Sequence, residues 1–333
     1  MKILFRLSFV LGLLAIFGLT GNALAQETQS AQHKAPVLDS ASGQDQGDDV
    51  ELPKIIHRSL NNLGTDENRY AHGATPRHKK FSTLAVPQNG IQYHGGPVML
   101  TTKVIYYIWY GNWSGNSAVT ILTDLANHIG GSPYFNINTT YTNSAGTPIT
   151  NTVSYGGSTT DNYSRGTQLS DTAIRNVVSD AITSGRLPKN TNGIYFVLTS
   201  QDVTATSGFC TRYCGWHTHG TISSSDIKYS FVGNPARCIN SCAAQSTGPN
   251  GNAGADGMAS IISHELEEAV TDPDLNAWYD TSGEENADKC AWTFGTTSTA
   301  GNGSKYNMTL GSRNYLIQQN WVNASGGFCA KSH

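Results

Sequence analysis

The stretch from residue 256 to 273 limits the possible folds of this chain more than any other part of the sequence. It reads DGMASIISHELEEAVTDP. It predicts one helix, because Asp256 can cap the N-terminus and Pro273 disfavours a helical conformation in the residue before it. At roughly 100° per residue the apolar side chains share one broad arc, and His264 and Glu268 stand together on the opposite side. We therefore expect a helix that packs on its apolar face and presents an imidazole and a carboxylate one turn apart.

This pair can hold a cation, since an imidazole nitrogen and a carboxylate oxygen one turn apart converge on one point. Glu265, turned away from them, is expected to activate a metal-bound water and not to be a ligand. The pattern is His-Glu-x-x-Glu, which differs from the His-Glu-x-x-His of zinc peptidases in its second ligand. The competing interpretation is an ordinary i, i+4 pair on a helix surface.

A third ligand is expected about twenty residues further on, where an acidic cluster contains Glu285 and Asp288. The spacing leaves open which of the two binds the metal. His217 and His219 follow Cys214 in a segment that we expect to be a loop closed by a disulfide. A loop beside an acidic helix is a position for a catalytic imidazole, so His217 is a candidate for stabilising an oxyanion, although a structural role for both histidines is the alternative.

The N-terminus has the pattern of a secretory signal peptide, with an apolar run from residue 7 to 19 and a small-residue cleavage site after Ala25. Residues 26–87 are polar and lack a helical or strand period, so we expect a disordered pro-segment or linker. A short basic cluster at 77–80 is either part of this linker or a processing site. The globular domain is expected over residues 88–333, and the protein is expected to be secreted, or periplasmic in a Gram-negative cell.

All six cysteines lie in the C-terminal half, and an even number in an exported chain favours disulfides. Loop closure favours pairing near neighbours, which predicts Cys210–Cys214, Cys238–Cys242 and Cys290–Cys329. A structural zinc bound by the first four cysteines is the rival interpretation.

A formal net charge of −3 gives no electrostatic footprint for nucleic acid, and no stretch after the leader is apolar enough to span a membrane. The oligomeric state stays open.

Buried strands are predicted at 104–110 and 194–199 and a further strand at 150–155, with amphipathic helices at 117–129 and 169–184. Together with the helix at 256–272, this order predicts an α+β or α/β domain around a central sheet.

Several ordered motifs resemble the EXORDIUM, or phosphate-induced protein 1, family of secreted plant and microbial proteins. They cover roughly residues 90 to 330 and read YHGGP at 93–97, YIWYGNW at 107–113, YFVLTSQDV at 195–203, FCxxxCGWH at 209–217, VGNPxxCxxxC at 232–242, PNGxxGxDGM at 249–258, HExxE at 264–268, NAWY at 276–279 and ExADxC at 285–290. The resemblance implies an extracellular or cell-wall-associated protein without a settled activity. The leader predicts a bacterial member.

Two functions follow as hypotheses. The first is a zincin-like α+β domain with a central mixed sheet, an active-site helix and a disulfide-bearing insert, acting as a zinc-dependent hydrolase on a peptide or cell-wall-associated substrate. The second is a non-catalytic extracellular protein that binds glycan or a partner, with a structural ion or none. Trp109 and Trp113 suit sugar stacking in this second hypothesis, and burial at a strand end explains them equally well.

Overall fold

The computed structural model describes residues 90–333. The predicted signal peptide at 1–25, the polar segment at 26–87 with its basic cluster, and the start of the globular domain at residue 88 all lie outside this range. Among the described residues no helix is long and apolar enough to cross a membrane.

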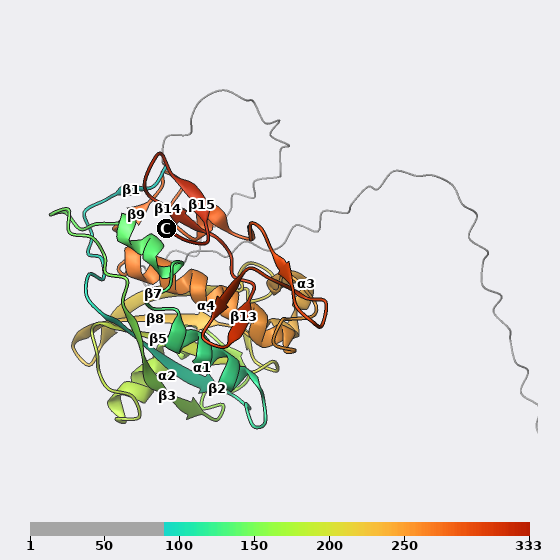
Figure 1. The fold of residues 1–333 in the computed structure, drawn as a ribbon. Helices are drawn as coiled ribbons and strands as arrows, with labels where there is room; N and C mark the ends of the chain where they lie inside the picture. The colour runs from blue at the N-terminus through green and yellow to red at the C-terminus, as the bar shows by residue number, and fades with distance from the viewer. Residues whose placement is uncertain (1–89) are drawn as a thin grey trace, which may run out of the picture. The chain divides into compact units, whose positions relative to one another are not determined.

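A five-stranded mixed sheet with the order β3-β2-β5-β8-β7 forms the centre of the fold (Figure 1). Four of its strands run parallel: β2 (Lys103–Tyr110), β3 (Val153–Asp161), β5 (Gly193–Thr199) and β8 (Ser225–Val232). The fifth, β7 (Gly215–Ile222), pairs antiparallel with β8 and forms one edge. The almost continuously apolar strands β2 and β5 are buried on both faces, as expected for the centre of a parallel sheet.

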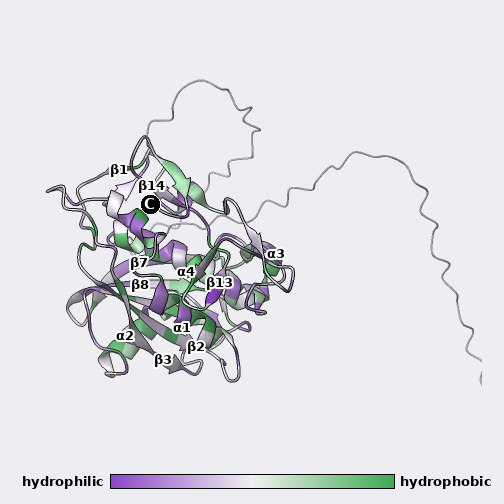
Figure 2. Cartoon of the chain, in the orientation of Figure 1, coloured by the Kyte–Doolittle hydropathy of each residue, from purple (hydrophilic) through white to green (hydrophobic). Residues whose placement is uncertain are grey.

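Three long helices cover the sheet. α1 (Ala118–His128) packs against β3 and against α4 (Ala253–Thr271), which lies over β5, β8 and β7. α2 (Asp171–Thr183) packs against β5 and β8. The connections from β2 to β3 and from β3 to β5 run in opposite directions along the sheet. Because such crossovers between parallel strands are right-handed, this order predicts α1 and α2 on opposite faces. In Figure 2 the hydrophobic residues gather in the central strands and on the helix sides that face them.

Shorter elements surround this core. They are β1 (Gln92–Tyr93) paired with β9 (Trp278–Tyr279), β4 (Gln168–Leu169) with β6 (Thr204–Ala205), β10 (Ser298–Thr299) with β11 (Lys305–Tyr306), β12 (Met308–Leu310) with β13 (Arg313–Tyr315), β14 (Asn320–Val322) with β15 (Phe328–Ala330), the helix α3 (Ile239–Cys242), and the 3₁₀ turns η1 (Phe135–Thr140), η2 (Pro235–Arg237) and η3 (Asp288–Cys290).

The helices predicted at 117–129 and 169–184 and the two buried strands are confirmed within one or two residues. Ser170 caps α2 by accepting a hydrogen bond from the amide of Ala173. The strand predicted at 150–155 is displaced, because β3 begins at Val153 and continues through Gly156 and Gly157 to Asp161. A Cβ at Gly156 would lie 2.4 Å from the Tyr106 ring. At this position β3 can approach Tyr106 so closely only because residue 156 has no side chain.

The prediction of a loop around His217 is wrong. His217 lies on β7, which forms a two-strand hairpin with β8, and the turn between them is made by Ser223 and Ser224, both with positive φ. Hairpin turns of this kind usually carry glycine or asparagine, so the two serines hid the signal. His217 consequently lies on a sheet edge, which positions its ring more firmly than a loop would.

All six cysteines form disulfides, and the rival zinc interpretation is therefore wrong for them. Cys290–Cys329 is confirmed, but the two short pairings are wrong: Cys210 bonds Cys238 and Cys214 bonds Cys242. Cys238 and Cys242 lie one helical turn apart, which points both sulfurs toward the neighbouring segment instead of toward each other. These two bonds each close a 28-residue separation and crosslink the segment before β7 to α3.

The buried Lys103 gives a test of the packing around β2. Its ammonium donates a hydrogen bond of 2.7 Å to the carbonyl of Thr150 and lies 5.5 Å from the centroid of the Phe135 ring. Burial lowers the pKa of Lys103 from 10.5 to about 8, and the negative charge of Glu267 acts against this shift.

Between pH 8 and 10.5 the unfolded chain therefore binds more protons at this lysine than the folded chain, so its contribution to stability rises with pH. We expect the stability of the native protein relative to Lys103→Met to increase across this window, as measured by urea unfolding at pH 7.5, 9 and 10.5. An unfolding free-energy difference that stays constant with pH would contradict this placement of Lys103.

Candidate metal centre

Helix α4 carries most of the candidate centre. It begins earlier than predicted: the side chain of Asn252 caps it by accepting from the amide of Ala255, while Asp256 lies in the first turn and accepts from Asn250. The competing interpretation of an ordinary pair on the helix surface is wrong, since all residues from 254 to 271 except Gly257 are buried. The carboxylates of α4 therefore face other protein segments.

His264 lies close to two carboxylates. Its Nε2 atom is 2.9 Å from Oε1 of Glu268 and 3.5 Å from Oδ1 of Asp288. Ligand atoms of these three side chains lie within 4.8 Å of one another, which is the spacing that one bound cation requires. Among residues 90–333 neither ring nitrogen of His264 has a hydrogen bond of good geometry, although Nε2 is at hydrogen-bonding distance from Glu268.

A second group shares Glu268 with the first. Nε2 of His217 on β7 lies 3.0 Å from Oε2 of Glu285 and 3.9 Å from Oε2 of Glu268. The two carboxylate oxygens of Glu268 thus face different histidines, Oε1 toward His264 and Oε2 toward His217. The structure therefore separates the two acids that the spacing left open: Asp288 lies with His264, and Glu285 lies with His217.

Glu265 is outside both groups, as its direction on the helix predicted. Its side chain is buried beside β7, where a Cβ at Gly215 would lie only 2.9 Å from Oε1. Among the described residues this Oε1 atom has no hydrogen-bond partner. Glycine at 215 leaves room for the carboxylate between the helix and the sheet edge.

Burial and neighbouring charges shift the acid–base properties of the cluster. Burial alone would lower the pKa of His264, but the negative charge of Glu268 and contact with Asp288 outweigh it and raise the pKa well above 6.5. Burial raises the pKa of Glu265 well above 4.5, and Glu268 raises it further. The pKa of Glu285 is also raised, first by burial and then by Asp272 and Glu268. Side chains with these properties favour protons or a cation in their midst.

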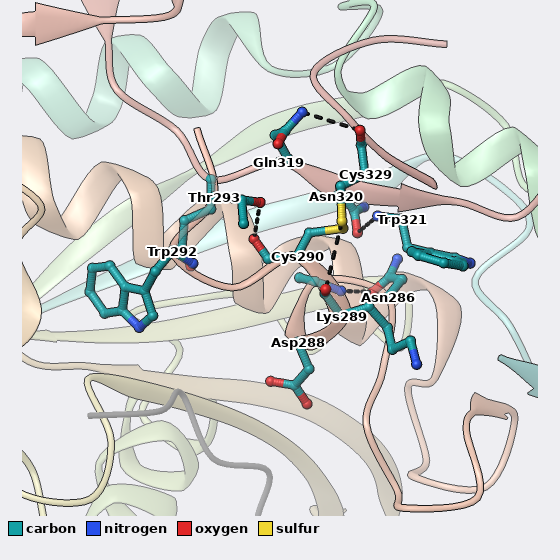
Figure 3. Close-up of a disulfide and its surroundings, with 12 residues drawn as sticks. Asn286, Asp288, Lys289, Cys290, Trp292, Thr293, Gln319, Asn320, Trp321 and Cys329 are labelled. Carbon is teal, nitrogen blue, oxygen red and sulfur yellow. Dashed lines mark hydrogen bonds between the residues drawn. A yellow bond between two sulfur atoms is a disulfide. The ribbon is translucent and has the colours of Figure 1, made fainter. Parts of the chain in front are cut away.

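The segment that carries Glu285 and Asp288 is fixed from several sides. The amide of Asp288 donates to Oε1 of Glu268 at 3.1 Å, and the amide of Trp321 donates to the carbonyl of Asn286 at 3.1 Å. Figure 3 shows the Cys290–Cys329 disulfide near Asn286 and Trp321, with the Asp288 carboxylate pointing away from the sulfurs. Helix α4, strand β14 and the disulfide together position this candidate ligand.

Glu267, a buried acid that the sequence did not single out as a candidate, connects α4 to the segments that carry Asn286 and Asn320. Glu267 is fully buried, and its Oε2 accepts from Nδ2 of Asn320 at 2.6 Å. Its backbone carbonyl accepts a hydrogen bond of 3.4 Å from Nδ2 of Asn286. Burial raises the pKa of Glu267 well above 4.5. Apart from its place in the helix motif, the sequence carries no signal that would link Glu267 to residue 320.

His219 belongs to a different cluster. Its Nδ1 lies 2.9 Å from Oδ1 of Asp226 and 3.6 Å from Oδ1 of Asp274. The ammonium of Lys228 contacts both acids and is 2.6 Å from Asp274. Because a lysine already supplies the positive charge here, we interpret this group as an ion-pair network and not as a metal site.

The Cys290–Cys329 disulfide supplies a stability test of the centre. Its partners are 39 residues apart, and closing a loop of this length stabilises a fold by about 4 kcal/mol. We expect Cys290→Ser with Cys329→Ser to lower the free energy of unfolding by roughly that amount, measured by guanidinium unfolding. The corresponding change at Cys210 and Cys238 serves as the control, since neither cysteine belongs to the segment that carries Asp288. The change at Cys290 and Cys329 should weaken metal binding more than this control. If both pairs weaken metal binding equally, the Cys290–Cys329 disulfide does not position Asp288.

The fold and the cluster define a disulfide-crosslinked α+β protein with a candidate metal centre on its central helix. A family model described as the phosphate-induced protein 1 conserved region matches residues 91–329. The chain is 33% identical to Protein EXORDIUM-like 3 of Arabidopsis thaliana over 271 residues, covering 69% of this chain and 80% of the relative. It is 32% identical to Protein EXORDIUM-like 5 of the same plant over 273 residues, covering 69% and 75%.

The chain belongs to the phosphate-induced protein 1 family, and the predicted resemblance is confirmed over the predicted range. These relatives are plant proteins, and the predicted bacterial source has no support from them. No solved structure matches this chain, so the zincin-like part of the fold prediction stays a prediction.

Proposed function

We propose that this chain is an extracellular metalloprotein of the EXORDIUM-like type with the layout of a zincin-like hydrolase. His264, Glu268 and Asp288 are the ligands of a divalent metal, with zinc the first candidate. The substrate class is a peptide or a cell-wall-associated polymer. Three disulfides support an extracellular location, because such bonds persist in oxidising compartments.

One observation carries this proposal: an imidazole and two carboxylates from α4 and η3 converge within 4.8 Å. Nitrogen and oxygen ligands in this number leave a tetrahedral ion with one open position, as in catalytic zinc sites. A bound ion would supply a polarised water at that position. A carboxylate in the place of the second histidine adds negative charge, which weakens this acidification and favours harder cations.

The remaining side chains have roles that follow from their positions. Glu265 lies on the next position of the helix without being a ligand, so it is the proposed proton acceptor. His217, on the sheet edge, is the proposed donor to a developing oxyanion. Glu285, at 3.0 Å from His217, orients that ring.

A structural metal site without catalysis is the second candidate, and burial favours it. His264 and Glu268 are at most 1% exposed and Asp288 is 10% exposed, which leaves little room for a polymer to reach the ion. In this case the metal would tie α4 to η3, and Glu265 would have no chemical role.

Substitution of Glu265 separates these candidates. We expect Glu265→Gln to keep the metal and to lose at least about 100-fold in turnover, because general-base catalysis contributes this much or more. The assay is cleavage of a random decapeptide library and of cellohexaose by zinc-loaded protein, read by mass spectrometry. Glu284→Gln, an exposed neighbour of the cluster, is the matched control.

Cleavage by the native protein and by the control, but not by Glu265→Gln, supports the hydrolase. A fully metal-loaded native protein that cuts neither probe would contradict hydrolysis of these two substrate classes and leave the structural ion. Loss of metal in Glu265→Gln would instead place this residue among the ligands.

A further inference from the structure

The central sheet has a second location where ligands commonly bind. The connection from β2 leads to β3 on one side, whereas β3 connects back across β2 to β5 on the other side. The order therefore reverses between β2 and β5. In open parallel sheets, ligands bind in the crevice outside the carboxyl ends of the strands at this reversal point.

A hollow of about 700 Å³ lies at that position. Its wall comes from the segments directly after the three parallel strands β2, β3 and β5, completed by one arginine from η2. The lining residues on which the proposal rests are Asn112, Tyr163, Gln201, Asp202 and Arg237. It is separate from the candidate metal centre, none of whose residues line it.

Hydrogen bonds fix this wall before any ligand arrives. The Tyr163 hydroxyl donates to Oδ2 of Asp202 at 2.8 Å and accepts from the amide of Asn112 at 3.0 Å. The Ser200 hydroxyl donates to Oδ1 of the same aspartate at 2.6 Å. Tyr163 has φ 55°, a left-handed conformation that is unfavourable for a side chain of its size. Such strain is concentrated at functional sites, where surrounding contacts hold it in place.

The chemistry of the wall favours a neutral ligand rich in hydroxyl groups. Asp202 and Arg237 carry one charge of each sign, so the wall has no net charge for an ionic ligand. Oδ1 of Asn112 already accepts a hydrogen bond from the amide of Ser114, and Nε2 of Gln201 donates one to the carbonyl of Ala236. The opposite ends of the two amides, Nδ2 of Asn112 and Oε1 of Gln201, therefore offer a donor and an acceptor to neighbouring hydroxyls. Tyr163 is half-buried and supplies an aromatic ring among these polar groups.

Phosphate binding at the adjacent start of α1 is disfavoured. The amide of Ala118, the first residue of the helix, already donates to Oδ1 of Asn116 at 2.9 Å. Nδ2 of Asn252 covers the same turn by donating to Asn116 and to the hydroxyl of Ser117, each at 3.0 Å. The usual nucleotide contact at a helix N-terminus is therefore occupied by the protein itself.

We propose that this hollow binds an uncharged oligosaccharide, with Asp202, Arg237 and the amides of Asn112 and Gln201 contacting sugar hydroxyls. Trp109 and Trp113, which the sequence analysis considered for sugar stacking, do not take part. Both are buried, and their ring centroids lie 5.2 Å apart. The aromatic surface comes from Tyr163 instead. This site needs no metal and stands or falls independently of the proposed hydrolase.

Binding of defined hexasaccharides to the full mature chain tests the proposal. The probes are cellohexaose, laminarihexaose and chitohexaose, titrated by calorimetry in chelator-containing buffer, with trigalacturonate as an anionic comparison. We expect at least one neutral probe to bind more tightly than trigalacturonate. Asp202→Asn and Arg237→Gln should each weaken this binding by at least about 10-fold, the loss of one hydrogen bond to a charged group.

Arg212→Gln, an exposed arginine away from the hollow, is the matched control and should bind like the native protein. Thermal unfolding of each variant shows whether it is folded. The proposal is overturned if no neutral probe binds to the native protein, if the anionic probe binds best, or if folded Asp202→Asn and Arg237→Gln both bind the neutral probes unchanged.

Discussion

Replacement of His264 by alanine is expected to abolish stoichiometric metal binding. The imidazole supplies the only nitrogen ligand of the His264, Glu268 and Asp288 group, and its Nε2 lies within 3.5 Å of both carboxylates. Loss of an outer contact to a metal ligand already costs 10- to 100-fold in affinity, so loss of the ligand itself should cost at least about 100-fold. The measurement is elemental analysis of purified protein after dialysis against a metal buffer.

His219→Ala is the matched control for this experiment. His219 also contacts two carboxylates, but Lys228 already balances their charge. We expect this variant to retain native metal content. Equal metal loss in both variants would mean that the metal binds elsewhere or that either change disturbs the whole fold, and circular dichroism would separate these two outcomes.

Removal of the metal by a chelator is expected to destabilise the protein, and the loss should grow with pH. At a free metal concentration of about 100 times Kd, binding to the folded state alone stabilises it by about 2.7 kcal/mol. The buried carboxylates of Glu265 and Glu285 have raised pKa values without the ion, because burial and neighbouring acids disfavour their charged forms. Chelation therefore leaves these groups in an unfavourable environment.

The sign of the pH effect follows from those shifts. A carboxyl group whose folded pKa lies above its unfolded value of 4.5 binds more protons in the folded state, so stability falls as pH rises from 4.5 through the folded pKa. The chelated protein should lose stability as the pH rises across that range. The metal-loaded protein should lose less, because the positive charge of a nearby ion favours the charged forms of these carboxylates.

Thermal unfolding of both forms between pH 5 and 8 provides this measurement. We expect the difference in Tm between metal-loaded and chelated protein to widen toward pH 8. A difference that is absent at every pH would show that no ion binds beside these carboxylates.

The sequence was most informative where one local pattern decided the structure. The helical period and the His-Glu-x-x-Glu spacing predicted α4 and the direction of its side chains, because i, i+4 neighbours meet on any helix. Buried strands β2 and β5 were predictable for a similar reason, since they are uniformly apolar between turn residues. These features depend on residues adjacent along the chain.

Features that depend on distant residues were not predictable from spacing. The separation of Glu285 from Asp288 arises because β7 brings His217 to one oxygen of Glu268 while η3 brings Asp288 to the other. Loop closure also favoured the wrong partners for Cys210 and Cys214, because the fold brings the segment before β7 to the distant residues of α3. The burial of α4 on all sides depends on the C-terminal strands, which carry no helical or strand period long enough to predict.

The most direct test of the metal centre is a crystal structure of zinc-loaded protein with anomalous data collected on both sides of the zinc absorption edge. We expect one anomalous peak at full occupancy, about 2.0–2.2 Å from Nε2 of His264 and from oxygens of Glu268 and Asp288. Glu265 should lie outside bonding distance of that peak. A map without a peak beside His264, from protein shown to carry zinc in solution, would contradict the assignment of these three ligands.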